Sequence, residues 1–325
     1  MVSRSPFDID VKYRGKDGKK FVITVNEGCS VAELKALIKK KRGLHPNRQR
    51  ITIPLQDPKA RPVVLEDEKY LEKDYSLRPE GTANAVLELK DLGPQIGYST
   101  VFFWEYFGPL IVYLFFFLRP SFVYGAGQSV LEQSTLQKIA GACWIFHYTK
   151  RIFETFFVHR FSKGTMPILN LFKNCSYYWM AGALVGYFLN HPLYTPPADI
   201  TVSIFGKPTL ITAEARVYVG LAIFVISEFL NFVVHWQLRN LRPPGTRVRA
   251  IPRGILFSLV SCPNYTFEIL AWAGFNIMTQ TAGGVMFMIV GALQMAIWAK
   301  QKHKSYRRDF KDYPRIRKAV FPLIL

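Results

Sequence analysis

Four side chains that can carry charge or pass on a proton lie inside one apolar stretch of the sequence. His147, Tyr148, Lys150 and Arg151 fall within residues 136–158, and aromatic and aliphatic residues flank them on both sides. The stretch is long enough to cross a bilayer, where a central charge costs about 3 kcal/mol or more unless it faces a polar cavity or a partner. The cluster therefore predicts the wall of an intramembrane site for an anion.

A carboxylate and a phenol could supply acid–base chemistry beside these cations. Glu105 is the one acid of the apolar stretch 100–118, and either a solvated helix end or a catalytic or orienting carboxylate explains it. Tyr148 precedes Arg151 by three residues, so the two share a helix face, and a phenol near a cation and a carboxylate can donate a proton. For Lys150 and Arg151, snorkelling to the interface is the alternative to a phosphate contact.

A second polar stripe crosses the end of a later apolar stretch. Asn231, His235, Arg239 and Arg242 recur at spacings of three and four residues, which places them along one face of a helix. This stripe suits a long polyanion such as a dinucleotide, because the planar fork of arginine binds phosphate in a bidentate way. A basic stop signal beside the membrane is the alternative, and it explains Arg242 better than Asn231 or His235.

A proline interrupts the next apolar stretch beside several polar residues. Pro263 is followed by Asn264, Tyr265 and Glu268, and we expect it to break or kink a helix there. The freed backbone groups must then pack against protein or line a cavity. No glycine-rich turn of the strand-to-helix type is present, so a dinucleotide would bind inside a helical bundle.

The elements that must position these residues are membrane helices. Half of the chain is hydrophobic, yet its formal net charge is +19. Its basic residues fall between apolar runs and form no continuous face, so we expect no nucleic acid partner. The four cysteines are too scattered for a metal cluster or a disulfide framework.

We predict six spans at about 100–118, 136–158, 170–190, 215–236, 256–279 and 284–300.

The loops between these spans differ sharply in charge. Lys and Arg are rare around 119–135, 191–214 and 280–283, and they are frequent in the alternate loops and after residue 300. The positive-inside rule then predicts that both termini are cytoplasmic.

Residues 1–93 have the pattern of a separate soluble domain, and residues 94–325 that of a membrane-embedded domain. Alternating apolar residues at 7–13 and 21–25 predict a hairpin, Ser30 and Glu33 predict a capping box that starts a helix, and this helix ends at Gly43. Further strands are expected at 51–53 and 86–89. This order resembles the ubiquitin-like β-grasp fold.

Several longer motifs resemble a known family. They are 146–151 (FHYTKR), 157–162 (FVHRFS), 191–197 (HPLYTPP), 261–266 (SCPNYT) and 312–314 (DYP). In this combination the chain is similar to the trans-2-enoyl-CoA reductases of very-long-chain fatty acid elongation, which belong to the steroid 5-alpha-reductase family. The resemblance covers nearly the whole chain.

The resemblance implies a multi-span enzyme of the endoplasmic reticulum membrane that contacts membrane lipid. It implies NADPH as cofactor, a long-chain 2-enoyl-CoA as substrate, and other enzymes of the elongation cycle as partners. The residues matching the family's catalytic positions are Glu105, Tyr148 and Tyr265. Those matching cofactor positions are Asn231, Arg239, Arg242, Asn264, Glu268 and Tyr306, and steroid-reducing relatives carry an acid at the position of His235.

The expected reaction adds a hydride to the β-carbon and a proton to the α-carbon of the thioester. A tyrosine hydroxyl, from Tyr148 or Tyr265, would hydrogen-bond the developing enolate, and Glu105 would orient this donor or the nicotinamide amide. Lys150 and Arg151 would hold phosphates of NADPH or coenzyme A. Two alternatives remain at this point: a membrane methyltransferase of the isoprenylcysteine type, and a catalytically inactive, reductase-like membrane adaptor.

Overall fold

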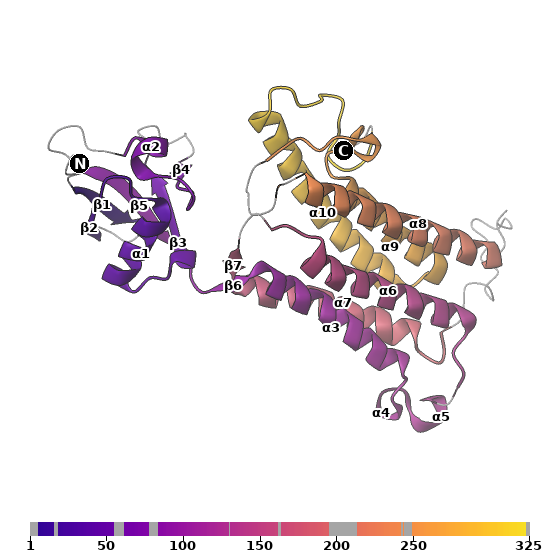
Figure 1. Cartoon of the computed structure of the whole chain (residues 1–325). Helices are drawn as coiled ribbons and strands as arrows, with labels where there is room; N and C mark the ends of the chain where they lie inside the picture. The colour runs from indigo at the N-terminus through magenta and orange to yellow at the C-terminus, as the bar shows by residue number, and fades with distance from the viewer. Residues whose placement is uncertain are drawn as a thin grey trace. The chain divides into compact units, whose positions relative to one another are not determined.

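The chain forms two compact units. The computed structural model describes residues 6–15, 19–54, 62–77, 84–129, 131–161, 164–194, 213–241, 243 and 249–322. One unit comprises residues 1–97 with 165–168, and the other comprises residues 98–164 with 169–325 (Figure 1). Of the predicted site residues, Arg242 lies outside the described part of the chain.

The first unit is built on a five-stranded sheet in the order β2-β1-β5-β3-β4. The strands are β1 (Phe7–Tyr13), β2 (Lys20–Val25), β3 (Gln49–Ile53), β4 (Val63–Val64) and β5 (Ala85–Asp91). β1 pairs antiparallel with β2 and parallel with β5, and β3 pairs antiparallel with β4 and β5. The inward residues of the alternating pattern, such as Ile9, Val11 and Leu87, are fully buried in the core. The predicted ubiquitin-like sheet is therefore confirmed, with the short β4 in addition.

Helix α1 (Val31–Arg42) packs its apolar stripe, Val31, Leu34 and Ile38, into this core. It begins at the predicted capping box, in which Ser30 Oγ accepts from the Glu33 N–H and the Glu33 carboxylate accepts from the Ser30 N–H. It ends at Gly43, whose φ of +69° suits a residue without a Cβ. The remaining elements of this unit are η1 (Pro46–Arg48), α2 (Leu71–Tyr75) and β6 (Gln95–Gly97), which pairs with β7 (Thr165–Pro167).

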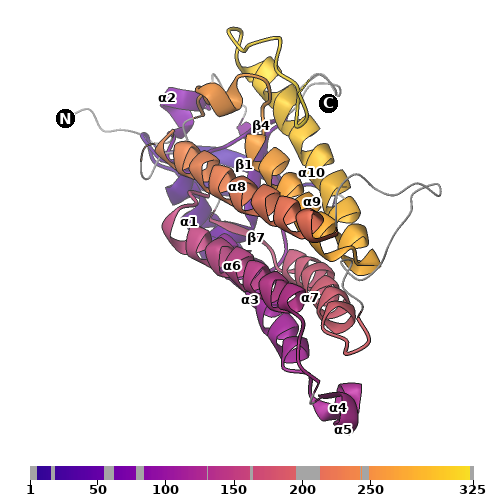
Figure 2. The same ribbon diagram turned by 90° about the vertical axis from the view of Figure 1, so that its right-hand side faces the viewer.

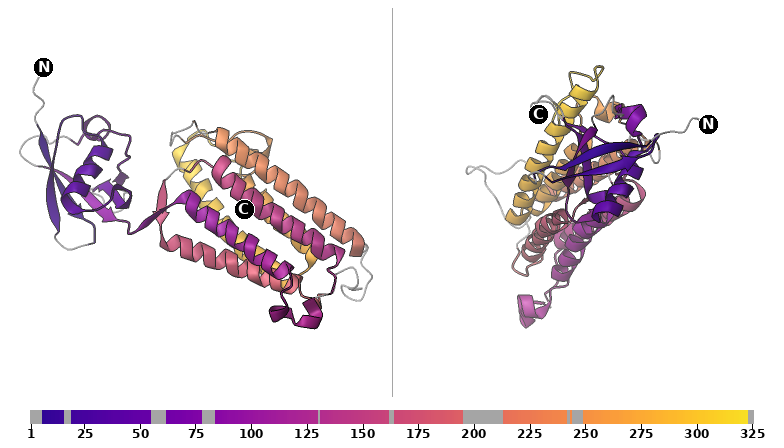
Figure 3. Two further views of the ribbon diagram at one scale, coloured as in Figure 1. Left: turned by 60° about the horizontal axis from the view of Figure 1, so that its bottom comes forward. Right: turned by 90° about the vertical axis from the view of Figure 1, so that its left-hand side faces the viewer.

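The second unit is a bundle of long helices with short connecting elements. Its helices are α3 (Tyr98–Phe117), α4 (Ser121–Tyr124), α5 (Ala126–Ser129), α6 (Thr135–Phe157), α7 (Leu169–Leu189), α8 (Ala213–Asn240), η3 (Ile255–Phe257), α9 (Pro263–Thr279) and α10 (Ala282–Asp309). The long helices lie lengthwise beside one another (Figures 2 and 3). A long helix is thus found at each of the six stretches that the sequence singles out.

Three of these helices are long and apolar enough to cross a membrane: Tyr98–Phe117, Glu214–Asn240 and Ala282–Asp309. Other candidate spans are absent only from the described part of the chain. Of the remaining long helices, α6 carries the charged cluster and α9 has only 17 residues. The structure therefore supports a membrane protein with at least these candidate spans, and the number six stays a prediction.

Glycines allow two pairs of helices to approach closely. On α8 and α9, a Cβ added to Gly220 would lie 2.6 Å from the carbonyl oxygen of Gly274, and one added to Gly274 would lie 2.6 Å from that of Gly220. On α3 and α7, a Cβ at Gly182 would lie 2.9 Å from the Cα of Pro109. Small residues of this kind are the usual means of packing helices in lipid. The resulting bundle brings α6, α8 and α9 together around one polar centre.

The sequence predicts a span at 256–279 that is broken or kinked at Pro263. The structure confirms the break and corrects the bounds, because α9 begins at this residue. A proline is well tolerated there, because the first N–H groups of a helix have no intrahelical partner. Just before it, the N–H groups of Ser261 and Cys262 donate to the carbonyls of Lys318 and Ala319. The C-terminal segment therefore satisfies the backbone beside Pro263.

Candidate active site

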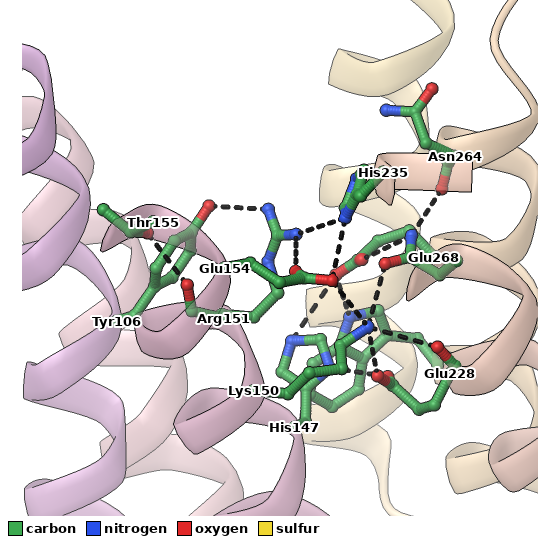
Figure 4. Close-up of polar contacts among 12 residues, drawn as sticks. Tyr106, His147, Lys150, Arg151, Glu154, Thr155, Glu228, His235, Asn264 and Glu268 are labelled. Carbon is green, nitrogen blue, oxygen red and sulfur yellow. Dashed lines mark hydrogen bonds and ion pairs between the residues drawn. The ribbon is translucent and has the colours of Figure 1, made fainter. Parts of the chain in front are cut away.

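A buried network of charged and polar side chains joins four helices (Figure 4). Its members are Tyr106 of α3; His147, Lys150, Arg151 and Glu154 of α6; Glu228, Asn231 and His235 of α8; and Asn264 and Glu268 of α9. On α6 and α8 these residues recur at steps of three, four and seven, so each helix presents them on one face. The network lies where the polar residues that the sequence singles out on α6, α8 and α9 meet.

Lys150 lies between two carboxylates and an amide. Its Nζ is 2.8 Å from Glu228 Oε2 and 3.6 Å from Glu154 Oε1, and it donates to Asn231 Oδ1 at 2.9 Å. Only 8% of the Lys150 side chain is exposed. A buried ammonium needs such partners, because removal from water costs several kcal/mol per ion.

Arg151 connects α6 to α3 and α8. Its Nη1 donates to Glu154 Oε2 at 2.8 Å and lies 3.4 Å from His235 Nδ1. Its Nη2 donates to the hydroxyl of Tyr106 at 2.8 Å. His235 Nδ1 lies 3.0 Å from Glu154 Oε1, so Glu154 binds both side chains.

His147 and Asn231 connect these ion pairs to α9. His147 Nδ1 lies 2.6 Å from Glu228 Oε1, and its Nε2 lies 3.4 Å from Glu268 Oε1. Both ring nitrogens of His147 therefore face carboxylate oxygens, one on α8 and one on α9. Asn231 Nδ2 donates to the Asn264 carbonyl at 2.8 Å and to Glu268 Oε2 at 3.3 Å.

Carboxylates thus compensate the cations that the sequence singles out. The sequence predicts that Lys150 and Arg151 are available to a phosphate, but in the structure both already have carboxylate partners within the protein. Phosphate binding by either side chain would require an exchange of partners. The acids responsible, Glu154 and Glu228, were missed by the sequence analysis, although Glu154 follows Lys150 by four residues and Glu228 precedes Asn231 by three.

Tyr148 lies beside this network in an aromatic enclosure. Its side chain is fully buried, and its hydroxyl has no hydrogen-bond partner among the described residues. The rings of Trp144 and His147 lie 5.1 and 4.9 Å from its own, and that of Tyr106 lies 6.4 Å away. A buried hydroxyl without a partner costs free energy, so the site suits a ligand that supplies one.

The other predicted site residues that the structure describes lie in four further places. Glu105 is buried between α3 and α7, where it accepts from Asn174 Nδ2 at 3.0 Å. Tyr265 packs on Trp298 in the apolar cluster of α9 and α10. Tyr306 stacks on Tyr313, 5.3 Å between ring centres. The guanidinium of Arg239 lies 4.8 Å from the Trp236 ring, near the end of α8.

One group of described residues has the donor types of a metal site. The ligand atoms of Glu154, His159 and His235 lie within 4.8 Å of one another. Burial, together with the charge of Arg151, lowers the pKa of His159 to about 3, which keeps its ring neutral. The guanidinium of Arg151 already contacts Glu154 and His235, so a divalent cation would face a fixed positive charge. The arrangement favours a protein ion pair at this position.

Comparisons with known proteins agree with this architecture. Residues 164–325 match the 3-oxo-5-alpha-steroid 4-dehydrogenase family, and residues 9–52 match the ubiquitin family. The chain is 47% identical over 321 residues to the very-long-chain enoyl-CoA reductase of Dictyostelium discoideum, covering 98% of this chain and 100% of that protein. It is 45% identical over 324 residues to the probable very-long-chain enoyl-CoA reductase art-1 of Caenorhabditis elegans, covering 96% and 98%.

Proposed function

The chain belongs to the family of very-long-chain enoyl-CoA reductases, and from this membership we infer that it reduces the 2,3 double bond of a long-chain trans-2-enoyl-CoA. It is therefore a membrane oxidoreductase that uses a nicotinamide cofactor. We further propose that the cofactor is NADPH and that the reaction is the last step of a fatty acid elongation cycle. Because the relatives are enoyl-CoA reductases, we set aside the two alternatives, a methyltransferase and an inactive adaptor.

The residues fit a cofactor of this kind in the bundle. Two buried polar atoms beside the network, Tyr148 Oη and Asn264 Oδ1, have no hydrogen-bond partner among the described residues. A nicotinamide amide donates hydrogen bonds, and a thioester carbonyl accepts them, so these two atoms suit the two ligands. When bound, NADPH supplies the hydride for the β-carbon.

The unpartnered hydroxyl of Tyr148 is the observation that carries the proposed mechanism. As the β-carbon receives the hydride, negative charge collects on the thioester oxygen, and a fixed donor in a site without water stabilises this charge strongly. Tyr148 can supply that donor. Tyr265 belongs to a different apolar cluster and contacts Trp298, so of the two candidate tyrosines Tyr148 is the better placed.

The remaining predicted residues keep proposed roles around this centre. Glu105 would orient the reacting groups from α3. The proposed cofactor contacts are Lys150, Arg151, Asn231, His235, Arg239, Arg242, Asn264, Glu268 and Tyr306. For Lys150, Arg151 and His235 the proposal includes a change of partner, because each of them is bonded to a carboxylate.

We propose an endoplasmic reticulum location with six spans and cytoplasmic termini. The same arrangement places the ubiquitin-like domain, residues 1–93, in the cytoplasm ahead of the membrane domain, residues 94–325. Its partners would be the acyl-CoA, membrane lipid and other enzymes of the elongation cycle.

Substitution of Tyr148 tests the mechanism. We expect Tyr148→Phe to lower the rate of NADPH oxidation with a long-chain 2-enoyl-CoA by roughly 100-fold, the typical effect of losing one donor to an oxyanion. Tyr113→Phe is the matched control, because Tyr113 is also fully buried and its hydroxyl also lacks a described partner. Equal rates in the two variants would refute the role of Tyr148.

A further inference from the structure

Tyr106 is held by a cation at the contact between α3 and α6. Arg151 Nη2 donates to the Tyr106 hydroxyl at 2.8 Å, and the guanidinium carbon lies 4.9 Å from the centre of the Tyr106 ring. Glu154 fixes the same guanidinium from the other side at 2.8 Å. Since the Tyr106 oxygen accepts from Arg151, its own hydrogen is available to another acceptor. Figure 4 shows this chain of contacts from Tyr106 to Glu154.

Tyr106 is also a close neighbour of Tyr148. Their ring centres are 6.4 Å apart, and the Tyr106 side chain is only 3% exposed. The charged and titratable groups that face Tyr106 come from α3, α6, α7 and α9: they are Glu105, Arg151, Tyr148, Tyr178 and Glu268. The hydroxyls of Tyr106 and Tyr148 therefore differ in a way that matters for proton transfer. Among the described contacts, a cation binds the hydroxyl of Tyr106 and none binds that of Tyr148.

We propose that Tyr106 is the general acid that protonates the α-carbon, while Tyr148 hydrogen-bonds the thioester oxygen. The proposal rests on the proposed function. The β-carbon gains the hydride from the nicotinamide, which is oxidised. The electron pair of the resulting enolate then forms the new C–H bond at the α-carbon as the O–H bond of Tyr106 breaks. The phenolate that remains takes up a proton from solvent before the next turnover.

The position of Arg151 explains this division between the tyrosines. A buried phenolate needs an opposite charge in contact, and Arg151 Nη2 already donates to the Tyr106 hydroxyl. The change of partner proposed for Arg151 concerns Glu154, which binds the other nitrogen, Nη1. A phenolate at Tyr148 would have no such partner in the described part of the chain. Tyr148 suits the other task, in which a hydroxyl donates a hydrogen bond and keeps its proton.

The first test compares Tyr106→Phe with the control Tyr113→Phe in the full-length enzyme. We expect Tyr106→Phe to lower kcat for a long-chain 2-enoyl-CoA by at least about 100-fold, because a general acid typically contributes a factor of 100 to 10,000. The Kd of NADPH, measured by its fluorescence, should change less than about twofold. A Tyr106→Phe enzyme with the kcat of Tyr113→Phe would overturn the proposal.

A second variant tests the acid role without changing the shape of the side chain. Fluorination makes a phenol more acidic, so 3,5-difluorotyrosine at position 106 should move the alkaline limb of the pH–kcat profile to lower pH. The same substitution at position 113 should leave that limb in place. A structural role for Tyr106 would not move the limb, and an unchanged profile would overturn the proposal even if Tyr106→Phe failed to fold.

The wild-type enzyme separates this proposal from the proposed function. If it does not oxidise NADPH with any 2-enoyl-CoA, the proposed function fails and the role of Tyr106 fails with it. If it is active, and both Tyr106 variants behave like their position-113 controls, only the role of Tyr106 fails.

Discussion

Glu228 is the acid whose removal should affect the stability of the bundle most clearly. Its carboxylate lies 2.8 Å from Lys150 Nζ and 2.6 Å from His147 Nδ1, and the residue is 2% exposed. Removing one partner of a buried ion pair typically costs about 3–5 kcal/mol, because the other charge is left uncompensated. In Glu228→Gln the amide keeps a hydrogen-bond acceptor near Lys150, and Asn231 still accepts from the ammonium at 2.9 Å. We therefore expect the lower end of this range, about 3 kcal/mol.

The assay is thermal unfolding of the full-length protein in detergent. For a folded unit of this size, about 3 kcal/mol corresponds to a decrease in Tm of roughly 6–12 °C. Glu132→Gln is the control, because the ion pair of Glu132 with Lys138 has a similar distance, 2.7 Å, but an exposed surface position. We expect its Tm to be unchanged, since exposed pairs contribute little.

A double variant tests the physical reason for the loss. Lys150→Met removes the stranded ammonium, so Lys150→Met combined with Glu228→Gln should recover more than half of the Tm lost in Glu228→Gln. Replacing both members of a buried pair by groups without charge is often neutral or stabilising. The reasoning is refuted if Glu228→Gln melts like Glu132→Gln, or if the double variant is less stable than both single variants.

Two further predictions concern the helix contact in the membrane unit and the core of the ubiquitin-like unit. Gly274→Ala should lower Tm, because its Cβ would lie 2.6 Å from the carbonyl oxygen of Gly220 and overpacking costs about 1–3 kcal/mol. Gly127→Ala is the control, because a Cβ there meets open space and should leave Tm unchanged. Equal Tm values in the two variants would contradict this packing. Burial, with a smaller contribution from the charge of Glu33, raises the pKa of Cys29 from 9.0 to about 11, so its alkylation at pH 8, followed by peptide mass spectrometry, should be slower in native than in denatured protein. The pKa of Cys29 is higher in the folded than in the unfolded protein, so the stability that the neutral thiol contributes is complete below pH 9 and is lost as the pH rises through about 11. If Cys29 is alkylated as fast in the native as in the denatured protein, the raised pKa is refuted.

Local patterns were enough to predict the longer elements of this fold, whereas short ones such as β4, β6 and β7 were not predicted. The capping box of Ser30 and Glu33, and the left-handed stop at Gly43, involve neighbours in sequence, so their outcome does not depend on the rest of the chain. The long apolar stretches behaved in the same way, and each became a helix. At Pro263 the sequence left a break and a kink open, and the structure has the break. The choice depended on distant residues, because the carbonyls of Lys318 and Ala319 accept from the N–H groups just before the proline.

The charged cluster of α6 shows where local reasoning ends. Its residues alone determined that ionisable groups would lie in an apolar segment and would need partners. Glu154 is a partner within α6 itself, three residues after Arg151. The tertiary structure decided that the partner from outside this helix is Glu228, and that Arg151 faces Tyr106. Glu228 and Tyr106 lie on other helices, far from the cluster in sequence. The strength of a charge interaction depends on the distance between the groups in space, and the spacing of residues along one helix does not determine its distance from another helix.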